Sequence, residues 1–180
     1  ARELSLDEVK NINVDIEKEI FVYGALCISY SGQCLMSSRV LNRSGNRGEC
    51  AGMCRLPYEL IEETTKIPTE GPYLLSPKEL NTLANLREII DSQVDSLKIE
   101  GRMKSPEYVG YVTKIFRRLI DCYYNNEVMN VYDEEIVNLK KLYNREFTLG
   151  HLFGSRNTKL MNIKSPNHIG TPLGKAYIEK

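Results

Sequence analysis

The alternation of hydrophobic and polar positions near the start of the chain predicts a short helix followed by a strand. Ser5 and Glu8 form a Ser-x-x-Glu capping box at the start of residues 5–12, in which two side chains satisfy free amides at the helix start. The run of Ile, Phe, Val and Tyr in residues 17–24 is typical of a strand. Residues 27–40 stay ambiguous between a loop and short helical turns.

Residues 73–125 are expected to repeat a strand–helix pattern. A short strand at 73–75 precedes residues 76–79, Ser-Pro-Lys-Glu, which have the cap, the first-turn proline and the glutamate of a helix start. A second strand is expected at 95–101, and Ser-Pro-Glu begins a second helix over residues 105–125. This order indicates an α/β fold with a parallel sheet, either closed on itself or doubly wound. The apolar stripe of the first helix consists of Leu80, Leu83, Leu86, Ile89 and Ile90.

The remaining segments give weaker patterns. Residues 56–68 are expected to be extended, as one half of a hairpin, and residues 134–142 to be helical. After Tyr143 the Gly, Pro, Asn and Lys content indicates loops that lead to a further module in residues 147–180, the start of a small β domain.

Composition limits the function classes. The chain has 180 residues, 42% of them apolar and 27% charged, with a formal net charge of zero, so no strong global field attracts nucleic acid or membrane. No apolar run approaches the roughly 20 residues of a membrane-spanning helix. The first residues have neither an initiating Met nor a secretory signal, so we expect a cytoplasmic protein whose sequence begins as if cut from a longer one.

Four of the five cysteines gather between residues 19 and 54, in the pattern C-x(6)-C-x(15)-C-x(3)-C. Cysteines crowded among glycines, without a secretory signal, favour a metal or cluster site over a disulfide framework. A 4Fe-4S cluster accepts irregular spacings, whereas a zinc ribbon uses two close pairs, of which the last two of these cysteines could form one. Unligated buried thiols are the third interpretation. The four residues are Cys27, Cys34, Cys50 and Cys54, while Cys122 lies on a helical stripe and is expected to pack in the core.

Residues 41–55 form an Arg- and Gly-rich loop. Four arginines in and beside it, Arg39, Arg43, Arg47 and Arg55, are opposed only by Glu49. The guanidinium fork suits phosphate, so the loop is expected either to bind phosphates or to be simply solvated.

The strand at 95–101 ends in charged residues. Alternation sends Leu97 and Ile99 to one face and Lys98 and Glu100 to the other, and Arg102 follows after a glycine. Charged residues at the carboxyl end of a parallel barrel strand lie where barrel active sites lie. The alternative is a Lys98–Glu100–Arg102 ion network that only supports the loop.

The sequence contains no pattern of a conventional protease. No Ser-His-Asp order, H-E-x-x-H helix or paired-Asp motif is present. Cys27 as a nucleophile would need a base, and both histidines, His151 and His168, are distant in sequence and expected at the surface.

The motif E-x-F-x-x-G-A-L-C-x(4)-G-x-C-x-M-S in residues 19–37 resembles the signature of the collagenase-like peptidases, family thirty-two of the unassigned (U) class. Three further segments resemble the same family: residues 48–55, 76–80 and 96–106. The resemblance implies the C-terminal part of a (β/α)-barrel in residues 1–128, and a helical linker with the start of a small β-rich C-terminal domain in residues 129–180.

The same resemblance implies an activity and a site. Some members of that family carry an iron–sulfur cluster and hydroxylate a pyrimidine in tRNA or ribosomal RNA, with prephenate as a co-substrate of the RNA members. The implied cluster ligands are the four cysteines of the motif, and Asn81 stands where many relatives have another cysteine. We expect Lys98, Glu100 and Arg102 to be catalytic residues of the pocket, and Arg43, Arg47 and Arg55 to contact RNA phosphates.

Two alternatives stay open. The family name implies a peptidase that acts on collagen-like or unfolded protein. The other alternative is a non-enzymatic fragment that associates with itself. Half a barrel would expose the edge of its sheet, and two copies would pair through that edge as a homodimer. The expected partners are thus RNA or peptide, without a membrane, and zinc or an empty, oxidised site is expected as the outcome of preparation in air.

Overall fold

The computed structural model describes residues 2–156, 159–172, 174 and 177. Its centre is a four-stranded mixed sheet in the order β5-β1-β4-β6, in which β1 is parallel to β5 and antiparallel to β4, and β4 is parallel to β6. A second, two-stranded sheet is the β2–β3 hairpin. The strands are β1 (Glu19–Ala25), β2 (Leu60–Glu62), β3 (Thr65–Ile67), β4 (Glu79–Asn81), β5 (Ser96–Ile99) and β6 (Phe147–Thr148).

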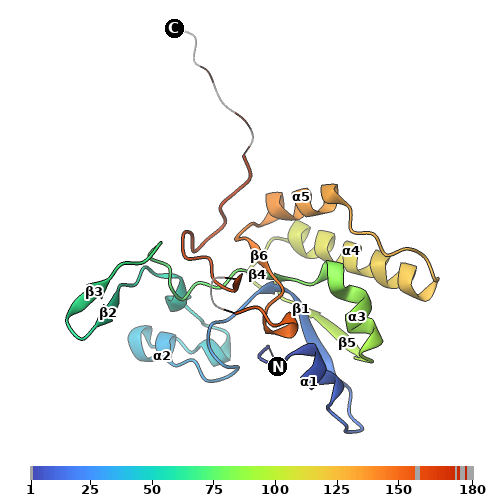
Figure 1. Ribbon diagram of the computed structural model, residues 1–180, viewed down its shortest axis with the longest axis horizontal. Coiled ribbons are helices and arrows are strands. Elements are labelled where there is room, and N and C mark those ends of the chain that lie inside the picture. Colours follow the sequence, from blue (N-terminus) through green and yellow to red (C-terminus); the bar gives the residue numbers. More distant parts are fainter. Residues whose placement is uncertain (1, 157–158, 173, 175–176, 178–180) are drawn as a thin grey trace.

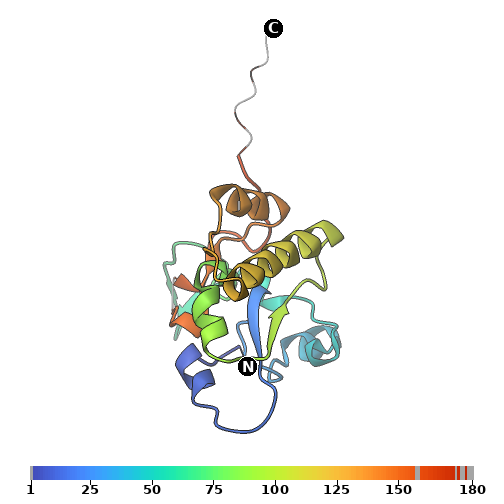
Figure 2. The ribbon, with the colours of Figure 1, turned by 90° about the vertical axis from the view of Figure 1, so that its right-hand side faces the viewer.

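In the described residues, five α-helices and four short 3-10 helices accompany the sheets. Figure 1 shows α3, α4 and α5 grouped on one side of β1, with α2 and the hairpin on the other side, and Figure 2 shows α4 lying across the sheet. The α-helices are α1 (Leu6–Lys10), α2 (Met36–Leu41), α3 (Leu86–Asp91), α4 (Pro106–Tyr124) and α5 (Asp133–Leu142). The 3-10 helices are η1 (Gly45–Arg47), η2 (Met53–Arg55), η3 (Leu83–Asn85) and η4 (His151–Phe153).

Local capping signals correctly predicted two of these helices. At α1, Ser5 and Glu8 form both hydrogen bonds of the capping box. At α4, the Ser105 side chain accepts the amide of Tyr108 and Pro106 occupies the first turn. The predicted helix at 134–142 is confirmed as α5, and the predicted strands at 17–24 and 95–101 are confirmed as β1 and β5.

The core lies between β1 and the helices. Val22, Leu86, Ile89, Val112 and Leu119 are completely buried in it. On β1, the pairing with β5 shifts register between Phe21 and Tyr23, a bulge that changes which face a side chain takes. The Tyr23 ring therefore packs in the core against the rings of Tyr108 and Phe116.

The predicted helix start at 76–79 is wrong. Glu79–Asn81 form β4, and the helical residues begin only at Leu83 in η3 and continue in α3. Tertiary contacts override the capping signal: the Thr82 hydroxyl donates to the Val22 carbonyl oxygen over 2.9 Å, and the Glu79 carboxylate pairs with Arg145 in the interior. The predicted strand at 73–75 is also wrong, because residues 74 and 75 form a turn.

Two other expectations need correction. The sheet is mixed rather than parallel, because β4 runs antiparallel to β1. The segment 56–68 holds both strands of a hairpin, not one half.

The segment after α5 adds β6 to the edge of the central sheet, beside β4. Residues 157–158, 173, 175–176 and 178–180 of the β-rich domain expected in residues 129–180 lie outside the described residues. None of the helices in the described part of the chain combines the length and the apolar character that crossing a membrane requires.

Candidate functional site

A cavity of about 760 Å³ brings together most of the residues singled out from the sequence. It lies beside β1 and the end of β5, and the loops around α2, η1 and η2 complete it. All four motif cysteines line it, and so do all three charged residues of the β5 end and one arginine of the basic loop. These residues are Cys27, Cys34, Cys50, Cys54, Lys98, Glu100, Arg102 and Arg43.

The parallel pairing of β1 with β5 places the strand ends at this cavity. Beyond the paired residues, the Glu100 amide donates to the Tyr23 carbonyl oxygen over 2.8 Å. Gly24 has φ +116°, and a Cβ there would lie 2.5 Å from the Glu100 carbonyl oxygen. Only glycine fits this approach, so Gly24 fixes the position of Glu100 relative to the first cysteine loop.

The four thiols share one environment without forming a disulfide. Cys27, Cys34 and Cys54 are half-buried and Cys50 is exposed, and all are free. Burial raises the pKa of the Cys54 thiol, and the neighbouring thiols of the other three raise it further while Arg55 lowers it. The other three cysteines therefore lie within electrostatic range of the Cys54 thiol.

Local hydrogen bonds hold the Cys50 segment. The Gly52 amide donates to the Cys50 Sγ over 3.3 Å. The buried Ser37 hydroxyl lies 3.9 Å from the same sulfur and accepts the Ala51 amide over 3.0 Å. These contacts tie the cysteine loop to α2.

The charged residues of β5 do not form the predicted ion network. Lys98 and Glu100 line the cavity, as strand alternation predicts, but the Lys98 ammonium lies 3.8 Å from Glu19 instead of pairing with Glu100. The Glu100 carboxylate accepts the Arg102 amide over 3.1 Å. The Arg102 guanidinium lies against the backbone of Gly48, where a Cβ would clash with it.

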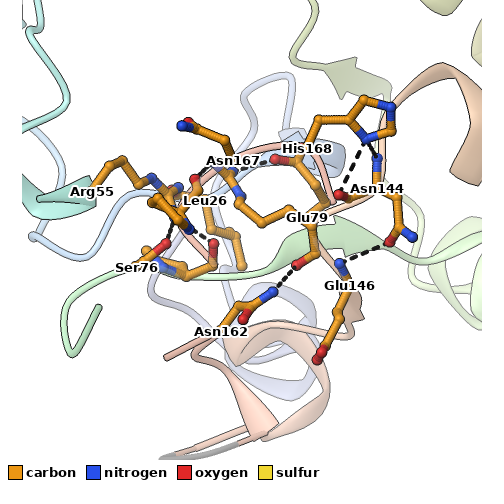
Figure 3. Close-up of polar contacts among 12 residues, drawn as sticks. Leu26, Arg55, Ser76, Glu79, Asn144, Glu146, Asn162, Asn167 and His168 are labelled. Carbon is orange, nitrogen blue, oxygen red and sulfur yellow. Dashed lines mark hydrogen bonds and ion pairs between the residues drawn. The ribbon is translucent and has the colours of Figure 1, made fainter. Parts of the chain in front are cut away.

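The three arginines predicted to contact RNA occupy different environments. Arg43 is exposed and lines the cavity, and Arg47 is exposed on η1. Arg55 instead turns inward, where its guanidinium donates to the carbonyl oxygens of Leu26 and Pro77 and to the Ser76 hydroxyl (Figure 3). Both terminal nitrogens of Arg55 thus donate to acceptors within the protein.

A histidine that sequence reasoning set aside lies near the first cysteine. His151 is half-buried rather than a surface residue, and it lines a second cavity of about 190 Å³ together with Cys27. The two are 124 positions apart, from 27 to 151, so no local signal could pair them. His168 is exposed, as predicted, and its Nδ1 accepts the Asn144 amide over 2.8 Å (Figure 3).

Sequence reasoning also missed a buried charge cluster beside the site. The Glu79 carboxylate, 1% exposed, pairs with Arg145, which is 5% exposed. Burial lowers the pKa of Lys104 to about 8 and that of Arg55 to about 10, and Glu79 opposes both shifts by stabilising the charged forms. The Glu79 carboxylate thus stabilises the charged forms of three cations from distant segments, Arg145, Lys104 and Arg55.

Comparison with known proteins gives a family and several named relatives. The family model for peptidase family U32 matches residues 1–162. A 23S rRNA 5-hydroxycytidine synthase of Escherichia coli is 35% identical, over 97% of this chain and 28% of its own length. A tRNA hydroxylation protein of Bacillus subtilis is 38% identical, over 81% of this chain and 37% of its own. A collagenase of Porphyromonas gingivalis is 35% identical, over 87% of this chain and 42% of its own.

The chain therefore spans between about a quarter and two fifths of the length of these three relatives. No solved structure matches it.

Proposed function

The chain belongs to peptidase family U32, and on this premise we propose that it acts as an iron–sulfur enzyme that hydroxylates a pyrimidine of tRNA or ribosomal RNA. One observation carries the proposal: four thiols and the charged end of β5 line a single cavity. Relatives named for rRNA and tRNA hydroxylation support the RNA substrate.

The cluster would be held by Cys27, Cys34, Cys50 and Cys54, the four thiols that line this cavity. In the described residues no three His, Cys, Asp or Glu side chains are grouped around one metal position. A zinc site needs all its sulfurs about 2.3 Å from one ion, whereas each thiolate of a four-iron cluster binds its own iron, so the sulfurs stand further apart. When bound, such a cluster supplies one-electron chemistry.

The charges at the rim of the cavity favour an anionic substrate. Four cations line the cavity, Arg2, Arg43, Lys98 and Arg102, against the two carboxylates Glu19 and Glu100. Counted on these side chains alone, the excess is two positive charges in a chain of zero net charge, and a bound cluster with its four thiolates would offset it by about two negative charges. The attraction for RNA phosphates would therefore come from the rim, from Arg43 and the neighbouring Arg47.

The cavity can hold a single base turned out of its strand. Its volume of about 760 Å³ is within the range of small-molecule pockets, roughly 300–1,000 Å³, and enzymes that modify bases extrude them into such pockets. There Glu100 would hold or accept a proton at its carboxylate, while Lys98 and Arg102 would orient the substrate. Prephenate stays a proposed co-substrate.

Nucleoside analysis tests this function. A strain lacking the gene should lose a 5-hydroxypyrimidine from its tRNA or rRNA, and the wild-type gene should restore it. Cys27→Ser should not restore it, and anaerobically purified Cys27→Ser protein should lack the visible absorbance of a cluster. Cys122→Ser, on the far helix α4, is the matched control and should behave as wild type. Unchanged nucleosides in the deletion strain would overturn the proposal.

The finer fold is part of the same proposal. The parallel β1–β5 pair, with α3 and α4 packed beside it, supports the C-terminal part of a (β/α)-barrel in residues 1–128. The start of a β-rich domain in 129–180, and pairing of two copies through an open sheet edge, remain proposals to be tested by the structure and mass of the full-length protein.

A peptidase is the second candidate, and one observation favours it. Cys27 and His151 line a common cavity, a cysteine nucleophile requires a base within hydrogen-bond reach, and a relative is named a collagenase. Substitutions at Cys34 and His151 distinguish the two functions. Peptidase activity on gelatin should need Cys27 and His151 but survive Cys34→Ser, whereas a cluster enzyme should lose hydroxylation in Cys34→Ser and tolerate His151→Gln.

A further inference from the structure

Arg55 connects three segments of the candidate site. It is the last residue of η2 and follows Cys54 directly. Its Nη2 donates to the Leu26 carbonyl oxygen over 3.0 Å, and its Nη1 donates to the Ser76 hydroxyl over 2.7 Å and to the Pro77 carbonyl oxygen (Figure 3). Leu26 directly precedes Cys27, so one guanidinium bridges the residues next to two of the four cysteines.

Little else joins these two cysteine segments. In the part of the chain that the structure describes, the Arg55–Leu26 contact is the one hydrogen bond between residues 25–28 and residues 50–56. Ser76 and Leu26 are buried, which anchors both acceptors in the packed protein. The Arg55 side chain is therefore the hydrogen-bonded link between these two segments in the described residues.

We propose that Arg55 is a positioning residue that sets the spacing of Cys27 and Cys54, rather than a contact for RNA. The planar guanidinium suits this role because its donors point in fixed, diverging directions. A lysine has one ammonium nitrogen and cannot reach acceptors on both sides at once. The buried Glu79 nearby offsets the cost of holding the cation away from water.

The spacing can be measured without metal. In the reduced, metal-free full-length protein, with Cys34, Cys50 and Cys122 changed to serine, dibromobimane becomes fluorescent when it bridges Cys27 and Cys54. Loss of hydrogen bonds from a charged donor should cut the yield of bridged product by about tenfold in Arg55→Met. Arg39→Met, which changes an exposed arginine on α2, should leave the yield unchanged.

Two further variants keep the test decisive if Arg55→Met fails to fold. Ser76→Ala removes one acceptor at a buried position with little change in volume, and should lower the yield by a smaller, measurable factor. Arg55→Lys should recover only part of the wild-type yield. A yield of bridged product in folded Arg55→Met or in Ser76→Ala equal to that of the protein with Arg55 and Ser76 intact would overturn the proposal.

A second readout rests on the proposed function, because it requires a bound cluster. The Arg55 charge should favour the reduced, more negative state, so Arg55→Met should shift the midpoint potential to more negative values, while Arg55→Lys should shift it less. An unchanged midpoint potential in Arg55→Met would refute the claim that the Arg55 charge favours the reduced cluster. The two failures are distinguishable: a wild-type protein that binds no iron would overturn the cluster function and leave the metal-free bridging result intact.

Discussion

Replacing Gly24 by alanine should destabilise the protein strongly because two independent costs meet at this residue. Its φ of +116° is a conformation that side chains rarely adopt. A Cβ would also lie 2.5 Å from the Glu100 carbonyl oxygen and 2.8 Å from the Glu100 Cβ. The obstacle is therefore the backbone of β5's continuation, which cannot rotate away as the end of a long side chain could.

The magnitude follows from these two terms. An unfavourable backbone conformation costs roughly 1–3 kcal/mol, and overpacking costs about 1–3 kcal/mol. Ordinary contact begins at 3.4 Å, so Glu100 must move by 0.9 Å, the difference between 3.4 and 2.5 Å. Together they give about 2–6 kcal/mol, and we expect a loss near the middle of that range, about 3–4 kcal/mol, which is a large share of the roughly 5–15 kcal/mol typical of a folded domain.

Urea unfolding followed by circular dichroism measures the loss. With a slope of about 2 kcal/mol per molar urea, the midpoint should fall by roughly 1.5–2 M. Gly110→Ala is the matched control, because Gly110 lies inside α4 with no atom near its would-be Cβ, and alanine there should add about 0.5–1 kcal/mol. Equal midpoints for the two variants would refute the steric argument.

Three other perturbations test the charges. Arg145→Met strands the buried Glu79 carboxylate and should cost about 3–5 kcal/mol in urea unfolding, against about 1 kcal/mol or less for Lys78→Met, whose partner is half-exposed. The pKa of Lys104 is lowered to about 8 from 10.5, so the unfolded state binds more protons than the folded state between these pH values, and the free energy of unfolding should rise from pH 8 toward 10. Lys104→Met should flatten that rise. An unchanged slope of the free energy of unfolding against pH would contradict the assignment of the rise to Lys104. Arg43→Gln should reduce the salt dependence of RNA binding, log Kd against log salt, by about 0.7, whereas an unchanged slope would remove Arg43 from the interface.

Sequence alone predicted the elements whose signals are local. The capping box at Ser5 and the Ser-Pro start of α4 act within one turn of helix, so four residues contain the necessary information. Strand alternation likewise placed Lys98 and Glu100 on the cavity face. The cysteine motif predicted that the four thiols gather, and all four line one cavity, although the distances between their sulfurs depend on contacts that no spacing encodes.

The same kind of signal failed where a distant partner decided the outcome. Residues 76–79 carry a valid helix start, yet Glu79 enters a strand because its carboxylate pairs with Arg145, 66 positions away. Arg55 lies in a loop whose composition is typical of phosphate binding. Its side chain nevertheless turns inward, to acceptors 21 to 29 positions away in the sequence. An arginine's role is decided by whether buried acceptors lie within its reach, which only the tertiary structure determines.

The bulge in β1 shows how the core and the site constrain each other. Strict alternation would place Tyr23 on the same face as Phe21, which lines the cavity, but the register shift turns the Tyr23 ring into the aromatic core beside α4. The Tyr23 carbonyl oxygen still accepts the Glu100 amide. A residue locked by core packing thus holds the backbone of a cavity residue, and rigid support of this kind is what a precise site requires. Loosening the core at Tyr23 should therefore disturb Glu100 before it disturbs the cysteine loop, whose anchors are Ser37 and Arg55.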